Sequence, residues 1–311
     1  MNKKLLIISI VLFMNLLVFA QITEVEKTIR DKEKMIATPD STTTSNWKNG
    51  GVIDLNISQA SFKNWAAGGE NSLAFNGLLS VYANYKKEKN SWDNMLDIGY
   101  GRLYQGDGSS YIKTDDKFDF SSKYGRMLSE KWYYAGLLNF KTQMTQGYNY
   151  PNDSIAISNL LAPGYLVGAL GMDYKPNTYF TAFMAPLTGK ITIVNDKTLS
   201  DEGAYGVEPG EIFKNEFGGY IRLMYNREFM KKSISFLSKL DLFTNYLNKP
   251  ENVDVSWENI IGFKVNKYLS ATITAQLVYD DDIKATDSNG NVIGPKTQFK
   301  EIIGIGFNYK F

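Results

Sequence analysis

The sequence contains no histidine and no cysteine in its 311 residues, and these two absences exclude most enzyme chemistry. A Ser-His dyad needs a base that titrates near neutral pH. Without thiols the chain has no disulfide bond, no thiolate nucleophile, and no ordinary zinc, haem or iron–sulfur site. A hydrolase built on paired carboxylates stays open as an alternative, but we expect no enzyme, no cofactor and no metal.

An excess of charge of either sign is absent as well. The chain has 34 Lys and Arg residues against 33 Asp and Glu residues, which gives a formal net charge of +1. This balance gives no reason to expect a nucleic-acid partner.

Long hydrophobic runs are absent except at the N-terminus. Lys3 and Lys4 precede an apolar stretch over residues 5–19, and a cleavage position follows at Ala20. The pattern predicts a secretory signal peptide, residues 1–20. A retained transmembrane anchor is the alternative, although the run is short for a span of about 20 residues.

The segment after the signal peptide is polar. Residues 22–35 are charged and compatible with a helix, and residues 37–50 are rich in Thr, Ser, Asn and Gly. We interpret residues 21–50 as a periplasmic helix and linker. The alternative is that this segment plugs the interior of the domain that follows.

Aromatic residues are abundant. The chain has 20 Tyr and 18 Phe residues, and its aromatic content is 14%, yet its mean hydropathy is only −0.27. A soluble core with so many rings would usually be more hydrophobic on average. A transmembrane β-barrel combines both properties, because apolar residues occupy alternate positions of its strands and aromatics gather at the two membrane interfaces.

From residue 51 onward the dominant hydrophobic period is two. In residues 234–246, Phe236 and Leu242 share one face, and Lys239 and Asp241 share the other. Such segments run about 12–16 residues, against about 5–6 for strands of soluble domains. A soluble sheet also alternates, but a soluble lipocalin-like barrel has about eight shorter strands. The pattern therefore predicts an all-β fold, a transmembrane antiparallel up-and-down β-barrel over residues 51–311.

Twelve strands are predicted. They cover residues 51–58, 72–86, 91–105, 115–127, 131–145, 164–174, 178–195, 216–227, 233–247, 252–265, 268–280 and 298–311. With this count the short connections fall on one side and the long loops on the other, and both termini lie in the periplasm, since bacterial barrels have even strand numbers and short periplasmic turns.

The segment 178–195 is the doubtful strand, because Pro186 and Gly189 would also suit a hairpin. We keep it whole, with a bulge or kink near Pro186. The reason is a single apolar face, to which the alternation assigns Tyr179, Phe183, Leu187, Ile191 and Ile193.

The last strand ends on an aromatic residue. Phe307, Tyr309 and Phe311 share a face, and this ending resembles the signal by which barrel proteins are handed to their insertion machinery. The terminal strand must pair with the first strand to remove the open edge. We therefore expect outer-membrane lipid and the barrel insertion machinery among the partners.

The inward faces carry charges of both signs. We expect these residues to line the lumen and to pair with one another. The candidates are Asp93, Asp97, Lys117, Asp119, Lys123, Lys141, Arg222, Lys239, Asp241, Glu258 and Lys264.

Two outer loops combine aromatic side chains with carboxylates or amides, which suits contacts to a sugar or a peptide. The ligand candidates are Phe62, Trp65, Glu70, Tyr148 and Tyr150. Interfacial anchoring and loop packing explain such rings equally well. A third loop opens with three acids, residues 280–282. These could face a divalent cation, but they lack EF-hand spacing and are more typical of a solvated loop mouth.

Several stretches resemble an uncharacterised outer-membrane barrel family of the Bacteroidota, which is catalogued as a domain of unknown function. They are Ser61–Asn71, Trp92–Asn94, Lys113–Lys117, Gly147–Ser154 and Ala185–Lys190. The resemblance implies the barrel and its location in the outer membrane, and it supplies no activity.

We therefore expect a narrow, porin-like pore or transporter for small solutes, because twelve strands lie between a filled eight-strand barrel and an open sixteen-strand porin. The alternative is a non-conducting structural or partner-binding barrel of the cell envelope.

Overall fold

The computed structural model describes residues 45–61, 70–106, 110–150, 152–230, 233–264, 266, 269–286 and 292–310. The predicted signal peptide and the predicted periplasmic helix lie outside the described residues, as do Phe62, Trp65 and Phe311. Within the ranges described, no helix is long and apolar enough to cross a membrane.

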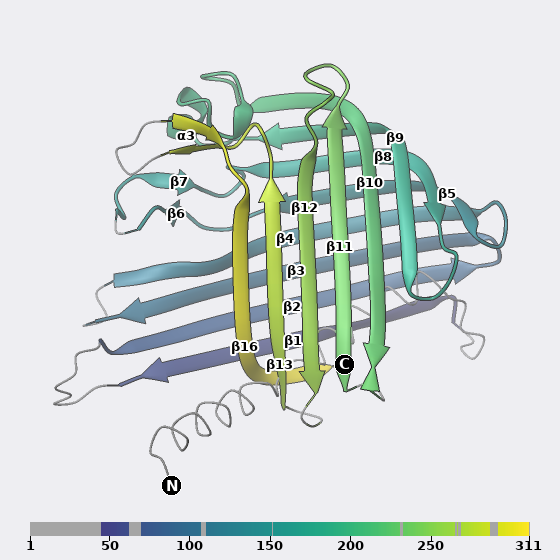
Figure 1. Cartoon of the computed structure of the whole chain (residues 1–311), viewed down its shortest axis with the longest axis horizontal. Coiled ribbons are helices and arrows are strands. Elements are labelled where there is room, and N and C mark those ends of the chain that lie inside the picture. The colour runs from purple at the N-terminus through teal and green to yellow at the C-terminus, as the bar shows by residue number, and fades with distance from the viewer. Residues whose placement is uncertain are drawn as a thin grey trace, which may run out of the picture.

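The wall of the molecule is built from twelve long antiparallel strands, which confirms the predicted number (Figure 1). They are β1 (Trp47–Ala60), β2 (Ser72–Lys87), β3 (Asn90–Gln105), β4 (Ser110–Met127), β5 (Trp132–Thr142), β8 (Gly164–Tyr174), β9 (Phe180–Ile193), β10 (Phe213–Phe229), β11 (Ile234–Asn245), β12 (Asp254–Lys264), β13 (Leu269–Tyr279) and β16 (Gln298–Lys310). Strand β1 begins within the segment interpreted as linker, and β9 is undivided.

The connections separate the barrel into two ends. Short turns join β2 to β3, β4 to β5, β8 to β9, β10 to β11 and β12 to β13, and we name this side the turn end. Longer connections, apart from the short one between β3 and β4, occupy the opposite side, the loop end. They carry the hairpins β6 (Gly147–Tyr148) with β7 (Ala156–Ser158) and β14 (Lys284–Thr286) with β15 (Val292–Pro295). They also carry the helix α3 (Lys197–Asp201) and the 3₁₀ turn η1 (Ala204–Gly206).

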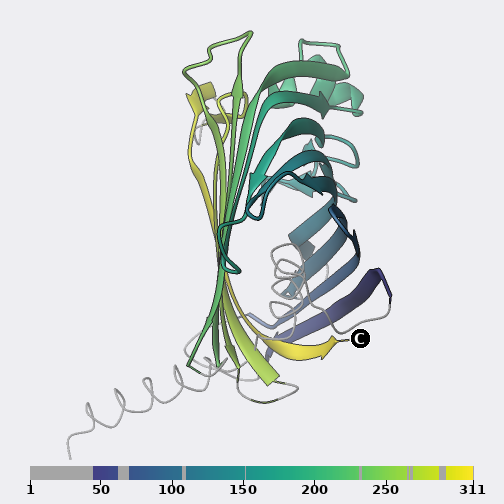
Figure 2. The ribbon, with the colours of Figure 1, turned by 90° about the vertical axis from the view of Figure 1, so that its right-hand side faces the viewer.

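The first and last strands join at the turn end. Val52–Leu55 of β1 pair with Phe307–Lys310 of β16, so the predicted partner of β1 is confirmed. This ladder has four residue pairs among the described residues, whereas each other neighbouring pair in the wall is matched over ten or more. Figures 1 and 2 show β1–β4 and β10–β13 as two facing walls whose strands run in different directions.

The outer surface of the strands is apolar. Large side chains remain exposed at alternate positions across the wall, and near the turn end they include Trp47, Trp92 and Tyr124. The ring of Trp47 packs against those of Tyr85 and Trp92, with centroids 5.2 and 5.8 Å apart. Apolar surface of this extent is unfavourable in water, and aromatic rings at a strand end suit a membrane interface.

Strand β9 corrects one sequence prediction. The pairing of β9 with β10 shifts register at Gly218 and Tyr220, which lie opposite Thr188 and Ala185. The extra residue forms a bulge beside Pro186 and reverses the alternation on either side of it. The single apolar face was therefore wrong. Phe183 lies inside with 2% of its surface exposed, while Leu187 lies outside at 56%.

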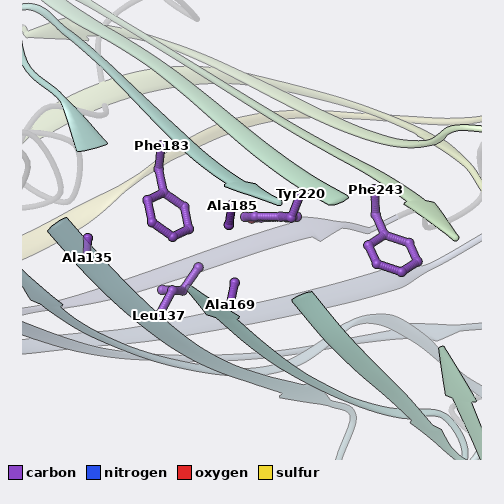
Figure 3. Close-up of a cluster of buried hydrophobic side chains, with 7 residues drawn as sticks. All are labelled: Ala135, Leu137, Ala169, Phe183, Ala185, Tyr220 and Phe243. Carbon is purple, nitrogen blue, oxygen red and sulfur yellow. The ribbon is translucent and has the colours of Figure 1, made fainter. Parts of the chain in front are cut away.

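The interior contains an apolar cluster that the alternation did not predict. Side chains of β5 and β8 face side chains of β9, β10 and β11 (Figure 3). The rings of Phe183 and Tyr220 meet edge to face at a centroid distance of 6.3 Å. The cluster consists of Ala135, Leu137, Ala169, Phe183, Ala185, Tyr220 and Phe243.

The bulge requires a close approach between β8 and β9, and this gives a stability prediction. A Cβ at Gly171 would lie 2.0 Å from the Met184 carbonyl oxygen, whereas a Cβ at Gly168 would meet nothing within 4 Å. Gly171→Ala is expected to destabilise the barrel by about 1–3 kcal/mol through overpacking. Urea unfolding of the protein in detergent measures the change, and Gly168→Ala is the matched control. Equal stability of the two variants would contradict this packing.

Candidate functional site

The period of two places one face of each strand inside the barrel, and many of those residues are charged. Buried charged residues include Asp93 and Asp97 on β3, Asp119 on β4, and Lys190 on β9. Charges buried in this way need partners, because an unpaired charge removed from water is unfavourable by several kcal/mol. The interior pairs form three layers along the barrel axis.

The middle charge layer is built from neighbours in register. Asp119 lies opposite Lys141, Arg222 opposite Asp241, and Lys239 opposite Glu258. Arg222 and Asp241 form a bidentate pair, since Nε donates to Oδ1 over 2.6 Å and the terminal nitrogen donates to Oδ2 over 3.0 Å. The layer comprises four bases and four acids: Lys117, Lys141, Arg222, Lys239, Asp97, Asp119, Asp241 and Glu258.

Two interactions of the middle charge layer cross the lumen. Lys141 Nζ of β5 lies 3.8 Å from Asp241 Oδ2 of β11, although these strands are four places apart around the wall. Lys117 of β4 interacts electrostatically with Glu258 of β12 on the facing wall. The charges therefore join the two walls as well as adjacent strands.

The turn-end layer contains fewer groups. Lys123 Nζ of β4 donates to Asp173 Oδ2 of β8 over 2.7 Å, and Lys175 lies 3.3 Å from the same oxygen. Lys175 also sits over the ring of Tyr133, 4.8 Å from its centroid. Asp93 is buried nearby and interacts electrostatically with both lysines.

The loop-end layer surrounds Lys190. Its Nζ lies 2.7 Å from Asp254, 3.3 Å from Glu216 and 3.6 Å from Asp280. Asp254 and Lys190 stand on strands separated by β10 and β11, so this contact also spans the interior. Five acids meet three lysines in the layer: Glu216, Asp254, Asp280, Asp281 and Asp282 with Lys190, Lys214 and Lys249.

The three adjacent acids of residues 280–282 take different partners. Asp280 faces Lys190, Asp281 accepts a hydrogen bond from Asn252 over 2.7 Å, and Asp282 pairs with Lys214. Carboxylate oxygens of Asp254, Asp280 and Asp281 lie within 4.8 Å of one another, as cation ligands would. Lys190 already supplies positive charge there. Burial raises the pKa of the Asp280 carboxyl above its ordinary value, against the opposing effect of Lys190.

The lumen candidates from the sequence distribute over these layers. Eight form the middle charge layer, and Asp93 and Lys123 belong to the turn-end layer. Lys264 lies exposed at the end of β12. Sequence reasoning missed Asp173, Lys175, Lys190, Glu216 and Asp254. The alternation of inward and outward positions could have found the members of this set that lie on strands. Their partners become evident only from the bulge in β9 and from the arrangement of the two walls.

The loop candidates have roles within the protein. The Tyr150 hydroxyl accepts from the Lys113 backbone N–H and donates to the Tyr111 carbonyl, both over 3.3 Å. The Tyr148 hydroxyl donates to Gln146 over 2.8 Å. Glu70 is exposed, while Phe62 and Trp65 lie outside the described residues.

One carboxylate fastens the loop between β5 and β8. Asp116 accepts hydrogen bonds from the backbone N–H groups of Met144 and Thr145 over 2.8 and 2.9 Å, and from Lys113 over 3.0 Å. Lys113 also donates to Gln143 over 3.0 Å. The stretch Lys113–Lys117 thus holds the base of this loop over the loop end of the lumen.

An apolar exterior, aromatic rings near a strand end and a charged interior define the class of the protein. It is a transmembrane antiparallel β-barrel of the outer-membrane type.

The comparison with protein families agrees with the sequence resemblance. Residues 57–148 match a family described as a protein of unknown function, DUF3078. A comparison with curated proteins found no match.

Solved structures with a similar course of the chain are outer-membrane proteins. The COG4313 outer membrane channel from Pseudomonas putida F1 aligns at a TM-score of 0.41 and 11% identity, over 88% of this chain and 99% of that one. The translocator domain of autotransporter NalP from Neisseria meningitidis aligns at 0.35 and 10%, over 92% and 96%. The FrpB iron transporter from Neisseria meningitidis aligns at 0.30 and 10%, over 94% of this chain and 49% of that one.

The bidentate pair of the middle charge layer gives a prediction on stability. Arg222→Ala leaves the buried Asp241 carboxylate without its main partner, and we expect a loss of about 3–5 kcal/mol in the free energy of unfolding. Lys197→Ala removes a pair whose lysine is 86% exposed, and such pairs contribute about 0–1 kcal/mol. Guanidinium unfolding of both variants in detergent measures the difference. Similar losses in the two variants would show that the interior pair is solvated.

Proposed function

We propose that the protein is a narrow pore for small hydrophilic solutes in the outer membrane, with the turn end and both termini in the periplasm. The observation that carries the proposal is the succession of charged layers along the interior. Ionisable side chains are unfavourable within a membrane unless they pair with one another or face water, and they often mark ion and solute pathways. A barrel whose interior only had to be filled would be equally stable with apolar side chains.

The location follows from two features taken together. The N-terminal segment has the pattern of a secretory signal peptide, and barrels with short turns on one side place those turns in the periplasm. Catalysis is not part of the proposal. The chain has no histidine or cysteine, and the described interior carboxylates lie among lysine and arginine side chains.

The loop-end layer suggests the charge of the preferred solute. Among the described residues of this layer, five acids exceed three lysines, so the layer has an excess of negative charge. A mouth of one sign concentrates ions of the opposite sign. The proposed pore therefore favours small cations weakly, because the middle charge layer is balanced.

A non-conducting barrel is the second candidate. It is favoured by the contacts of the middle charge layer that cross the lumen and by the apolar cluster on one side of the interior. In that case the outer loops would be the functional surface and would bind an envelope partner.

Planar-bilayer recording of the purified protein separates the two candidates. We expect conductance steps smaller than those of a sixteen-stranded porin in the same bilayer, and a reversal potential in a salt gradient that indicates cation preference. A variant without residues 21–44, which retains all of β1, tests whether the N-terminal segment closes the pore. If both forms stay closed although their electrophoretic mobility shows folded barrels, the non-conducting barrel is favoured.

The raised pKa of Asp280 predicts a dependence on pH. As pH falls, this carboxyl is protonated before an ordinary carboxyl of pKa about 4. The mouth then loses negative charge, and cation preference is expected to decline while ordinary carboxyls are still ionised. Reversal potentials recorded from pH 7 down to pH 4, which is approximately the pKa of an ordinary carboxyl, measure the change in cation preference. Asp280→Asn should have the lower preference already at neutral pH. A preference that is constant over this range would contradict the role of Asp280.

A further inference from the structure

Lys141 has longer ion-pair contacts than Arg222 and Lys239, whose shortest distances are 2.6 and 3.6 Å. Its Nζ lies 4.0 Å from Asp119 Oδ2 and 3.8 Å from Asp241 Oδ2, both beyond hydrogen-bond distance. About a third of its side chain is exposed, at 34%, against 13% for Arg222 and 15% for Lys239.

The two acids beside Lys141 do not depend on it for hydrogen bonds. Asp119 accepts from Asn139 over 2.7 Å. Asp241 accepts from the Tyr220 hydroxyl over 2.8 Å, in addition to its bidentate pair with Arg222. If the ammonium group of Lys141 moves away, both carboxylates keep these partners.

Lys141 also reaches across the interior, as Lys117 does. It stands on β5 and reaches Asp241 on β11, whereas Arg222 and Lys239 pair with adjacent strands. Its flexible four-carbon stem can turn along the lumen without a change of the backbone. The path between the walls is then wider, and the positive charge of Lys141 is displaced.

We propose that Lys141 is the movable gate of the lumen and sets how strongly the pore opposes cations at mid-height. This inference rests on the proposed pore function, and it assigns the regulation of that pore to one side chain. The resting position of Lys141 lies between Asp119 and Asp241, and the passage of a small cation displaces it along the wall.

Single-channel recording of Lys141 variants tests the proposal. Lys141→Ala removes the gate and its charge, and we expect roughly a twofold or greater rise in cation conductance. Lys141→Arg retains the charge and can form hydrogen bonds to both acids, so its conductance should equal or fall below that of the natural protein. Lys197→Ala, on an exposed loop helix, is the control and should leave conductance unchanged.

Electrophoretic mobility before and after heating shows that each variant is folded. If the natural protein conducts and Lys141→Ala conducts equally, the proposed gate is contradicted and the proposed pore is not. If the natural protein is closed and Lys141→Ala alone opens, the gate is supported. If every folded variant stays closed, the pore is excluded and the gate with it.

Discussion

In the hydrocarbon layer of a membrane every backbone N–H and C=O group needs a partner within the protein, because no water is present to take that place. Strands meet this requirement when each one pairs with its neighbours until the last strand reaches the first. In this protein β16 returns to β1, and among the described residues the ladder that joins them is the shortest in the wall. Closure also fixes which face of each strand meets lipid. Charged side chains near the centres of the spanning strands, such as Asp119 and Asp241, are thereby brought into the interior.

The interior charges then act on the shape of the barrel. Pairs in register, such as Arg222 with Asp241, neutralise neighbouring strands. Pairs from strands that are not neighbours, such as Lys117 with Glu258, link the two walls. An apolar cluster around Phe183 and Tyr220 fills one side between them. The charge of the described interior residues changes from balanced in the middle charge layer to mostly acidic in the loop-end layer.

The fold was largely accessible from the sequence because a period of two and the order of short and long connections each constrain strand number. The inward position of charges such as Asp119, Lys141 and Asp241 followed from the same alternation. The bulge at Pro186 was predicted, but its reversal of the inward and outward alternation was not. Phe183 was therefore assigned to the outer face. Contacts between facing walls, such as Lys117 with Glu258, depend on how closely the two walls approach each other. No local pattern of residues encodes that distance.

The contact between Lys190 of β9 and Asp254 of β12 is the most direct measure of whether interior charges join strands that are not neighbours. A double-mutant cycle with Lys190→Met and Asp254→Asn, followed by unfolding in detergent, isolates the interaction of these two side chains from their other partners. Pairing at 2.7 Å across the interior predicts a coupling energy of about 1–3 kcal/mol. Additivity of the two single changes within about 0.5 kcal/mol would show that the side chains of β9 and β12 do not meet at this layer.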